Sequence, residues 1–168
     1  MICCVTGHRP AGFPFSREEN SIEYVFYQEK LISEITKLIH AGYLTFIFGV
    51  ADGADTDFAN AVIHLRDNEG YNISLEAAMP FPINPSKNPT EKTLDRITLL
   101  KMCNRVHTVS PYFHKGCMQK RNEFMVDRAD LVLAIWNGIQ KGGTWNTIKY
   151  GTKKGKAFKY IMLNEFLV

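Results

Sequence analysis

The chain has 168 residues, of which 45% are hydrophobic and 22% are charged, and its formal net charge is +3. This composition excludes an intrinsically disordered chain, and no apolar run approaches the ~18 residues that a membrane helix needs. The length fits one domain over residues 1–168, and the small net charge does not by itself indicate a nucleic-acid-binding protein.

The N-terminus and the cysteines favour a cytoplasmic protein. Residues 1–8, MICCVTGH, lack the basic segment and the long apolar segment of a signal peptide. The four cysteines show no CxxC spacing, which fits neither a disulfide framework nor a zinc site: Cys3, Cys4, Cys103 and Cys117. We therefore expect reduced thiols, no metal, no cofactor and no membrane association.

Apolar runs alternate with helical patterns along the whole chain. The apolar runs predict six strands, at Ile2–Thr6, Thr45–Val50, Ile73–Met79, Arg105–Val109, Leu131–Trp136 and Ala157–Leu163. The helical patterns between them predict five helices, at Ile22–Ala41, Ala54–Glu69, Pro89–Cys103, Lys115–Arg128 and Thr144–Lys154. The alternation predicts a three-layer α/β fold, with a mostly parallel sheet of about six to seven strands and helices on both faces. The proline-rich stretch Pro80–Asn88 fits either a lid or a simple connector.

Ligands of open α/β sheets bind beyond the carboxyl ends of the strands, and four corners of this chain carry polar or glycine-rich sequences there. The first corner contains Gly7, which permits a tight turn, His8, and Arg9, whose guanidinium suits a phosphate or carboxylate. A loop histidine is an acid/base candidate, but more often it only forms a local hydrogen bond.

The second corner has glycines on both sides of a turn, at Gly49 and Gly53, with Asp52 and Asp55 beside them. Its sequence is not GxGxxG, so the dinucleotide fingerprint is absent. Either carboxylate is a candidate acceptor for ribose hydroxyls, and either is equally a helix cap.

The third and fourth corners supply candidate phosphate contacts. The third has Arg121 and Asn122 near the start of a helix, where a plain surface arginine is the alternative. The fourth is a glycine pair followed by hydroxyl residues at a helix start: Gly142, Gly143, Thr144 and Thr147. Bare N–H groups, a hydroxyl and the helix dipole make a phosphate cradle, although both threonines are also ordinary N-cap residues.

Positive charge is concentrated in the C-terminal segment. Residues 141–168 contain six lysines and one acidic residue, Glu165, whereas residues 1–140 have a net charge of −2. This pattern indicates either a solvated lysine face on the last helix or an anion-attracting edge near a ligand site. We expect Trp136 in the core and Trp145 in the wall of the site.

Four motifs, in this order and spacing, resemble the YpsA-like family of the SLOG superfamily: VTGHRP, FGVADGADTDFANAV, KRNEFMVDRADLVLAIWNG and GGTWNTIKYG. The resemblance spans almost the whole chain. It implies a Rossmann-like fold and a nucleotide-derived ligand, including ligands of the ADP-ribose type, and it implies no particular reaction.

Two related groups imply different activities. The Lonely Guy phosphoribohydrolases, which cleave nucleoside monophosphates, are similar over Arg121–Thr144, but their glutamates after the GT are replaced here by Trp145, Asn146 and Thr147. Asp55, Glu123 and Asp127 are the candidate substitutes. The DNA-processing protein DprA, which binds single-stranded DNA, is similar at Gly49–Asp55 and at the Arg-Asn pair.

Together, the motifs and the resemblance favour binding of a nucleotide or ADP-ribose-type molecule in a sensor or regulatory role. The expected ligand-binding residues are Gly7, His8, Arg9, Gly49, Asp52, Gly53, Asp55, Arg121, Asn122, Gly142, Gly143, Thr144, Asn146 and Thr147. The alternatives are a phosphoribohydrolase, with Arg121 and Glu123 as catalytic candidates, and single-stranded nucleic-acid binding. Fold analogy adds a homodimer as an expected assembly.

Overall fold

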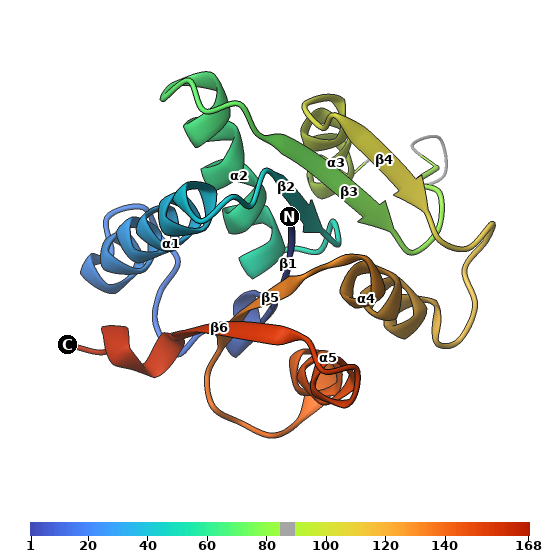
Figure 1. Ribbon diagram of the computed structural model, residues 1–168. Coiled ribbons are helices and arrows are strands. Elements are labelled where there is room, and N and C mark those ends of the chain that lie inside the picture. Colours follow the sequence, from blue (N-terminus) through green and yellow to red (C-terminus); the bar gives the residue numbers. More distant parts are fainter. Residues whose placement is uncertain (85–89) are drawn as a thin grey trace.

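A single parallel sheet forms the centre of the molecule (Figure 1). The computed structural model describes residues 1–84 and 90–168, and within them the sheet has six strands in the order β4-β3-β2-β1-β5-β6. The strands are β1 (Ile2–Gly7), β2 (Thr45–Phe48), β3 (Ser74–Met79), β4 (Arg105–Thr108), β5 (Leu131–Trp136) and β6 (Ala157–Met162). Each strand pairs in parallel with its neighbours, which confirms the predicted sheet.

Helices cover both faces of this sheet, as expected for a three-layer Rossmann-like fold. They are α1 (Ile22–His40), α2 (Ala54–Asp67), α3 (Glu91–Lys101), α4 (Cys117–Arg128) and α5 (Gly142–Lys153). Figure 1 shows α1 and α2 on one face and α4 and α5 on the other. Two short 3₁₀ helices, which the sequence analysis did not predict, lie at Pro10–Gly12 and Leu163–Phe166.

The core has two parts, one on each side of the sheet. The larger part packs α1, α2 and α3 against the sheet and includes the fully buried Tyr27, Phe46 and Phe58. The smaller part packs α4 against the other face through Met125 and Val126. Since the central strands are covered on both faces, they are continuous apolar runs, whereas the edge strands β4 and β6 are partly exposed.

The strand order reverses next to β1. Strands β2, β3 and β4 follow on one side of β1, and the chain then crosses the sheet through α4 to add β5 on the other side. In open α/β sheets, the loops at such a switch point diverge and leave a crevice beyond the carboxyl ends of the strands. We therefore expect a ligand site at the carboxyl ends of β1, β2 and β5.

Several predicted boundaries shift at that end of the sheet. Strand β2 ends at Phe48 and not at Val50, because Val50 adopts a left-handed backbone with φ of 58°. Helix α5 begins at Gly142, two residues before the predicted start, so both glycines belong to its first turn. Helix α3 was expected from Pro89, which lies outside the described residues together with residues 85–88 of the proline-rich stretch.

No helix within residues 1–84 and 90–168 has the length and apolar character needed to cross a membrane.

Candidate functional site

Two adjoining cavities open at the carboxyl ends of β1, β2 and β3. The polar cavity, of about 300 Å³, lies between the loop after β1 and the first turns of α4 and α5. The apolar cavity, of about 360 Å³, lies between the loops after β2 and β3 and the helices α3 and α4. Arg9, Ala51, Met118 and Arg121 line both cavities, so that the two form one crevice.

Arg121 stands at the junction of the two cavities. It is only 5% exposed, and its Nε donates to Oδ1 of Asn122 at 2.8 Å. Its two terminal amino groups have no hydrogen-bond partner or ion pair within residues 1–84 and 90–168. A Cβ on Gly49 would collide with the guanidinium, so glycine there makes room for it. A buried guanidinium with unused donors is available to an anion entering the crevice.

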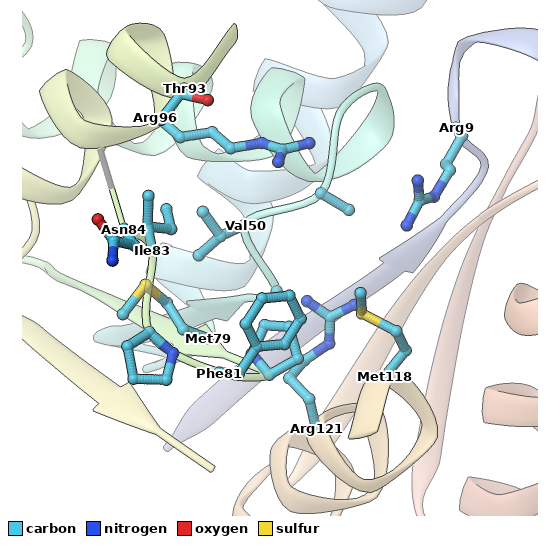
Figure 2. A pocket seen from close by; sticks show the side chains of 14 residues that line it. Arg9, Val50, Met79, Phe81, Ile83, Asn84, Thr93, Arg96, Met118 and Arg121 are labelled. Carbon is cyan, nitrogen blue, oxygen red and sulfur yellow. The ribbon is translucent and has the colours of Figure 1, made fainter. Parts of the chain in front are cut away.

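A second arginine faces Arg121 across the crevice. Figure 2 shows the Arg9 side chain reaching towards the apolar cavity from the loop after β1, while Arg121 rises from α4. Burial lowers the pKa of Arg121, the charge of Asp55 opposes this, and the positive charge of Arg9 lowers it further. The two cations repel each other, and an anion placed between them would relieve that repulsion.

Asp55 holds the loop after β2. Its Oδ2 accepts hydrogen bonds from the backbone N–H groups of Gly49 at 2.8 Å and Ala51 at 3.3 Å. These two groups flank Val50, whose positive φ is unfavourable for a β-branched residue. Burial raises the pKa of Asp55, and the Arg121 guanidinium opposes that rise. One carboxylate oxygen thus positions the loop that lines both cavities.

The first turn of α5 lines one end of the polar cavity. Lys141, at the N-cap, forms no side-chain capping bond, so the first N–H groups of the helix have no partner from that residue. Gly143 and Thr144 line the polar cavity. The Thr147 hydroxyl donates to the Gly143 carbonyl at 2.9 Å and is therefore already used within the helix.

His8 lines the polar cavity from the loop after β1. Burial lowers the pKa of His8, with a smaller opposing effect from the Asn137 side chain, and this shift favours the neutral imidazole. Its Nε2 is buried and has no hydrogen-bond partner in the described residues. The His8 carbonyl accepts from the backbone N–H of Ala54 at 3.0 Å, which attaches this loop to the start of α2.

Most of the predicted ligand-binding residues line the crevice. These are Gly7, His8, Arg9, Gly49, Asp55, Arg121, Asn122, Gly143 and Thr144. Asp52 and Gly53 line a third cavity beside α3, where Asp52 pairs with Arg96 at 2.8 Å. Gly142, Asn146 and Thr147 line none of these three cavities.

The carboxylates considered for hydrolysis are mostly directed elsewhere. Glu123 accepts from Gln119 at 3.0 Å and lines none of the three cavities, and Asp127 accepts from the Tyr150 hydroxyl at the other end of α4. Of the three, only Asp55 lines the crevice. No group of three or more His, Cys, Asp or Glu side chains that could hold a metal ion occurs in the part of the chain that the structure describes.

The apolar wall is the part of the site that sequence reasoning missed. It consists of Val50, Met79, Pro80, Phe81, Pro82, Ile83 and Met118. Phe113 packs edge-on against Phe81, with the ring centroids 5.4 Å apart. Met79 is the last residue of β3 and residues 80–83 directly follow it, so their place at the end of a strand was the available signal. From the sequence, the stretch that begins at Pro80 fits only a lid or a connector.

Two comparisons with known proteins bear on the family of the chain. The model of the YspA SLOG family matches residues 3–165. The uncharacterized SPbeta prophage-derived protein YoqJ of Bacillus subtilis (strain 168) is 26% identical over 139 residues, which cover 75% of this chain and 80% of that protein. Since the family match spans nearly the whole sheet and the crevice at its carboxyl edge, the chain belongs to the YspA SLOG family.

Proposed function

We propose that the crevice binds a nucleotide or ADP-ribose-type ligand, with phosphate in the polar cavity and the base in the apolar cavity. The observation that carries this proposal is the buried Arg121 guanidinium, whose unused donors lie at the junction of the two cavities. Membership of the YspA SLOG family supports a nucleotide-related ligand.

The phosphate assignment rests on converging positive groups. Arg9 and Arg121 are two cations against the single carboxylate of Asp55 among the residues described in the polar cavity. The α5 N-terminus adds N–H groups that the Lys141 side chain does not cap, and the positive end of the helix dipole, beside Gly143 and Thr144. A phosphate there would receive charge-assisted hydrogen bonds and would separate the two arginines.

The base assignment rests on the apolar wall. Val50 and Phe81 offer apolar surface in this cavity, and Met118, which lines both cavities, adds a polarizable thioether. No carboxylate lines this cavity within the described residues, and Arg96 at its edge is paired with Asp52. Such a cavity suits an uncharged aromatic base, because burying an unpaired charge there would be costly.

The same geometry favours binding over cleavage of an N-glycosidic bond. Cleavage needs a carboxylate that stabilises positive charge developing on the sugar. Asp55 is the one carboxylate that lines the crevice in the described residues, and its Oδ2 accepts two loop hydrogen bonds. A sensor or regulatory role therefore fits better than hydrolysis.

Isothermal titration with AMP, ADP, ADP-ribose and inorganic phosphate tests the proposal. We expect binding of at least one nucleotide and a loss of about tenfold or more in affinity for Arg121→Met, the range for a lost charged hydrogen bond. Arg105→Met is the matched control, since Arg105 is exposed and is the first residue of β4, at the end of the strand away from the crevice. Absence of heat with every nucleotide at millimolar concentration, or equal loss in both variants, would overturn the proposal.

A further inference from the structure

Helix α5 carries a second feature that the crevice does not use. Lys141, Trp145, Lys149 and Lys153 follow one another at intervals of four residues. Residues four apart lie on the same side of a helix, with their Cβ atoms about 6 Å apart. Three lysines and one tryptophan therefore form a single stripe, called here the lysine stripe.

The lysine stripe is the uncompensated part of the C-terminal positive charge. The other three lysines of residues 141–168 already have partners within the chain: Lys154 forms an ion pair with Asp127, Lys156 donates a hydrogen bond to the Ala129 carbonyl, and Lys159 forms an ion pair with Glu34. The three stripe lysines are exposed and have no ion pair in the described residues. Glu165 is the one acidic residue of residues 141–168, so this side of α5 attracts anions.

A row of aromatic rings lies beside the lysine stripe. Trp145 stacks on Trp136 of β5 with centroids 5.5 Å apart, Trp136 is 6.4 Å from Tyr160 of β6, and Tyr160 stacks on Phe158 at 5.7 Å. Because β6 is an edge strand and α5 packs on β1 and β5, the row is only partly covered, and Tyr160 is 43% exposed. Neither tryptophan lines the crevice, contrary to the wall position expected for Trp145.

From this juxtaposition we propose that the lysine stripe and the aromatic row form a surface for single-stranded nucleic acid. Single-strand sites combine cations that follow the backbone with aromatic rings on which bases stack. Here the stripe runs along α5 while the row follows β5 and β6 beside it. Lys149 and Lys153 are four residues apart, about 6 Å, which is comparable to the distance between successive phosphates in an extended strand.

This surface is a poor match for a second copy of the chain. A two-fold interface uses the same patch on both copies, so pairing through this surface would place one lysine stripe against another, and like charges that face each other across an interface are unfavourable. The proposal is also independent of the nucleotide crevice, because none of the stripe or row residues lines it. Failure of one proposal therefore leaves the other standing.

Intrinsic fluorescence provides a direct test, since both tryptophans of the chain belong to this surface. Titration with a twelve-residue oligothymidylate at low salt should quench the emission as bases stack on the rings. The affinity should fall with salt with a logarithmic slope of about −2, the value for three phosphates neutralised on a single strand.

Variants separate the two parts of the surface. Lys149→Gln combined with Lys153→Gln should change the slope of log affinity against log salt from about −2 to about −0.7, because one of the three phosphate contacts remains. Tyr160→Ala should weaken binding about fivefold or more without changing the slope, because stacking is not electrostatic. Lys101→Gln combined with Lys120→Gln removes the same charge from exposed positions on α3 and α4 and should leave binding unchanged.

Three outcomes would overturn the proposal. The first is no quenching, or quenching that the stripe variant does not alter. The second is loss of oligonucleotide binding in Arg121→Met with the stripe variant unaffected, which would move the strand to the crevice. The third is a dimer in sedimentation experiments that Tyr160→Ala converts to a monomer, which would assign the surface to contacts between copies.

Discussion

Asp55 lines the crevice, but the hydrogen bonds of its carboxylate hold a loop of the protein itself. Two of the possible roles were a ribose contact and a helix cap, and the structure gives its Oδ2 a third role, as acceptor for the N–H groups on both sides of Val50. The strained φ of Val50 persists because those two bonds hold the loop.

Asp55→Asn should loosen this loop. An amide accepts more weakly than a carboxylate, and its NH₂ group would face a loop N–H. We expect hydrogen exchange at the Ala51 amide to accelerate about tenfold or more, with weaker nucleotide binding. Exchange measured by NMR checks this, and the amides of β5 serve as the internal control. Unchanged protection at Ala51 would contradict the assigned role.

Glu34 is the residue whose charge matters most for pH dependence. It is 4% exposed and pairs with Lys159 at 2.7 Å, Lys37 at 2.8 Å and Lys30 at 3.2 Å. Burial alone would raise the pKa of Glu34, but the three lysines outweigh it and lower the pKa to about 2. A lowered folded-state pKa stabilises the protein above the unfolded-state value near 4.5, and this contribution is lost as the pH falls towards 2.

Glu34→Gln should therefore destabilise the protein at pH 7 by about 1–2 kcal/mol, a value reduced for the partial exposure of the lysines. The difference from the unaltered protein should shrink as the pH falls below about 4. Urea unfolding at pH 7 and pH 3 measures both effects. Glu29→Gln, an exposed change on the same helix, should have little effect at either pH.

At the scale of elements, the start of α2 determines where the loop after β1 lies. Gly53, the N-cap of α2, has φ of 93°, and a Cβ there would come within 2.5 Å of the His8 carbonyl oxygen. The N–H of Ala54 donates to that same oxygen. The two elements can approach this closely only because residue 53 has no side chain.

Gly53→Ala should lower the free energy of unfolding by about 3 kcal/mol or more, since it adds a collision to an unfavourable backbone conformation. Gly155→Ala is the matched control: Gly155 has φ of 66° but open space around it, so we expect a loss of about 1 kcal/mol. Chemical denaturation measures both losses. If the two variants lose the same free energy of unfolding, the close approach of Gly53 to His8 does not limit which residue can stand at position 53.

At the scale of the whole molecule, the crevice connects the two faces of the sheet. Its walls come from the loops after β1, β2 and β3 and from helices α4 and α5. A ligand that contacts all of them binds only the folded chain, so it stabilises folding by mass action.

A bound nucleotide at 100 times its Kd should therefore raise the Tm by about 5–10 °C. Differential scanning fluorimetry measures the shift for each nucleotide. Arg121→Met should melt normally without ligand and show a much smaller shift. A full shift in that variant would remove Arg121 from the ligand contacts.

The fold was largely predictable because its signals are local. Continuous apolar runs such as Leu131–Trp136 indicated buried parallel strands, and helical periodicity indicated the layers on both faces. The glycine-rich and arginine-bearing corners also indicated the polar cavity, since the carboxyl ends of parallel strands meet at one edge. Boundaries shifted where tertiary contacts override propensity, as at Val50.

What the sequence determined by itself was the kind of residue at each corner: a guanidinium, two carboxylates, a glycine pair at a helix start. Only the tertiary structure decided which of them meet, because strand order and helix packing turn Arg121 and Asp55 into the crevice but Glu123 away from it. The apolar wall and the aromatic row combine residues from separate elements, and such surfaces have no period along the chain that a sequence pattern could reveal.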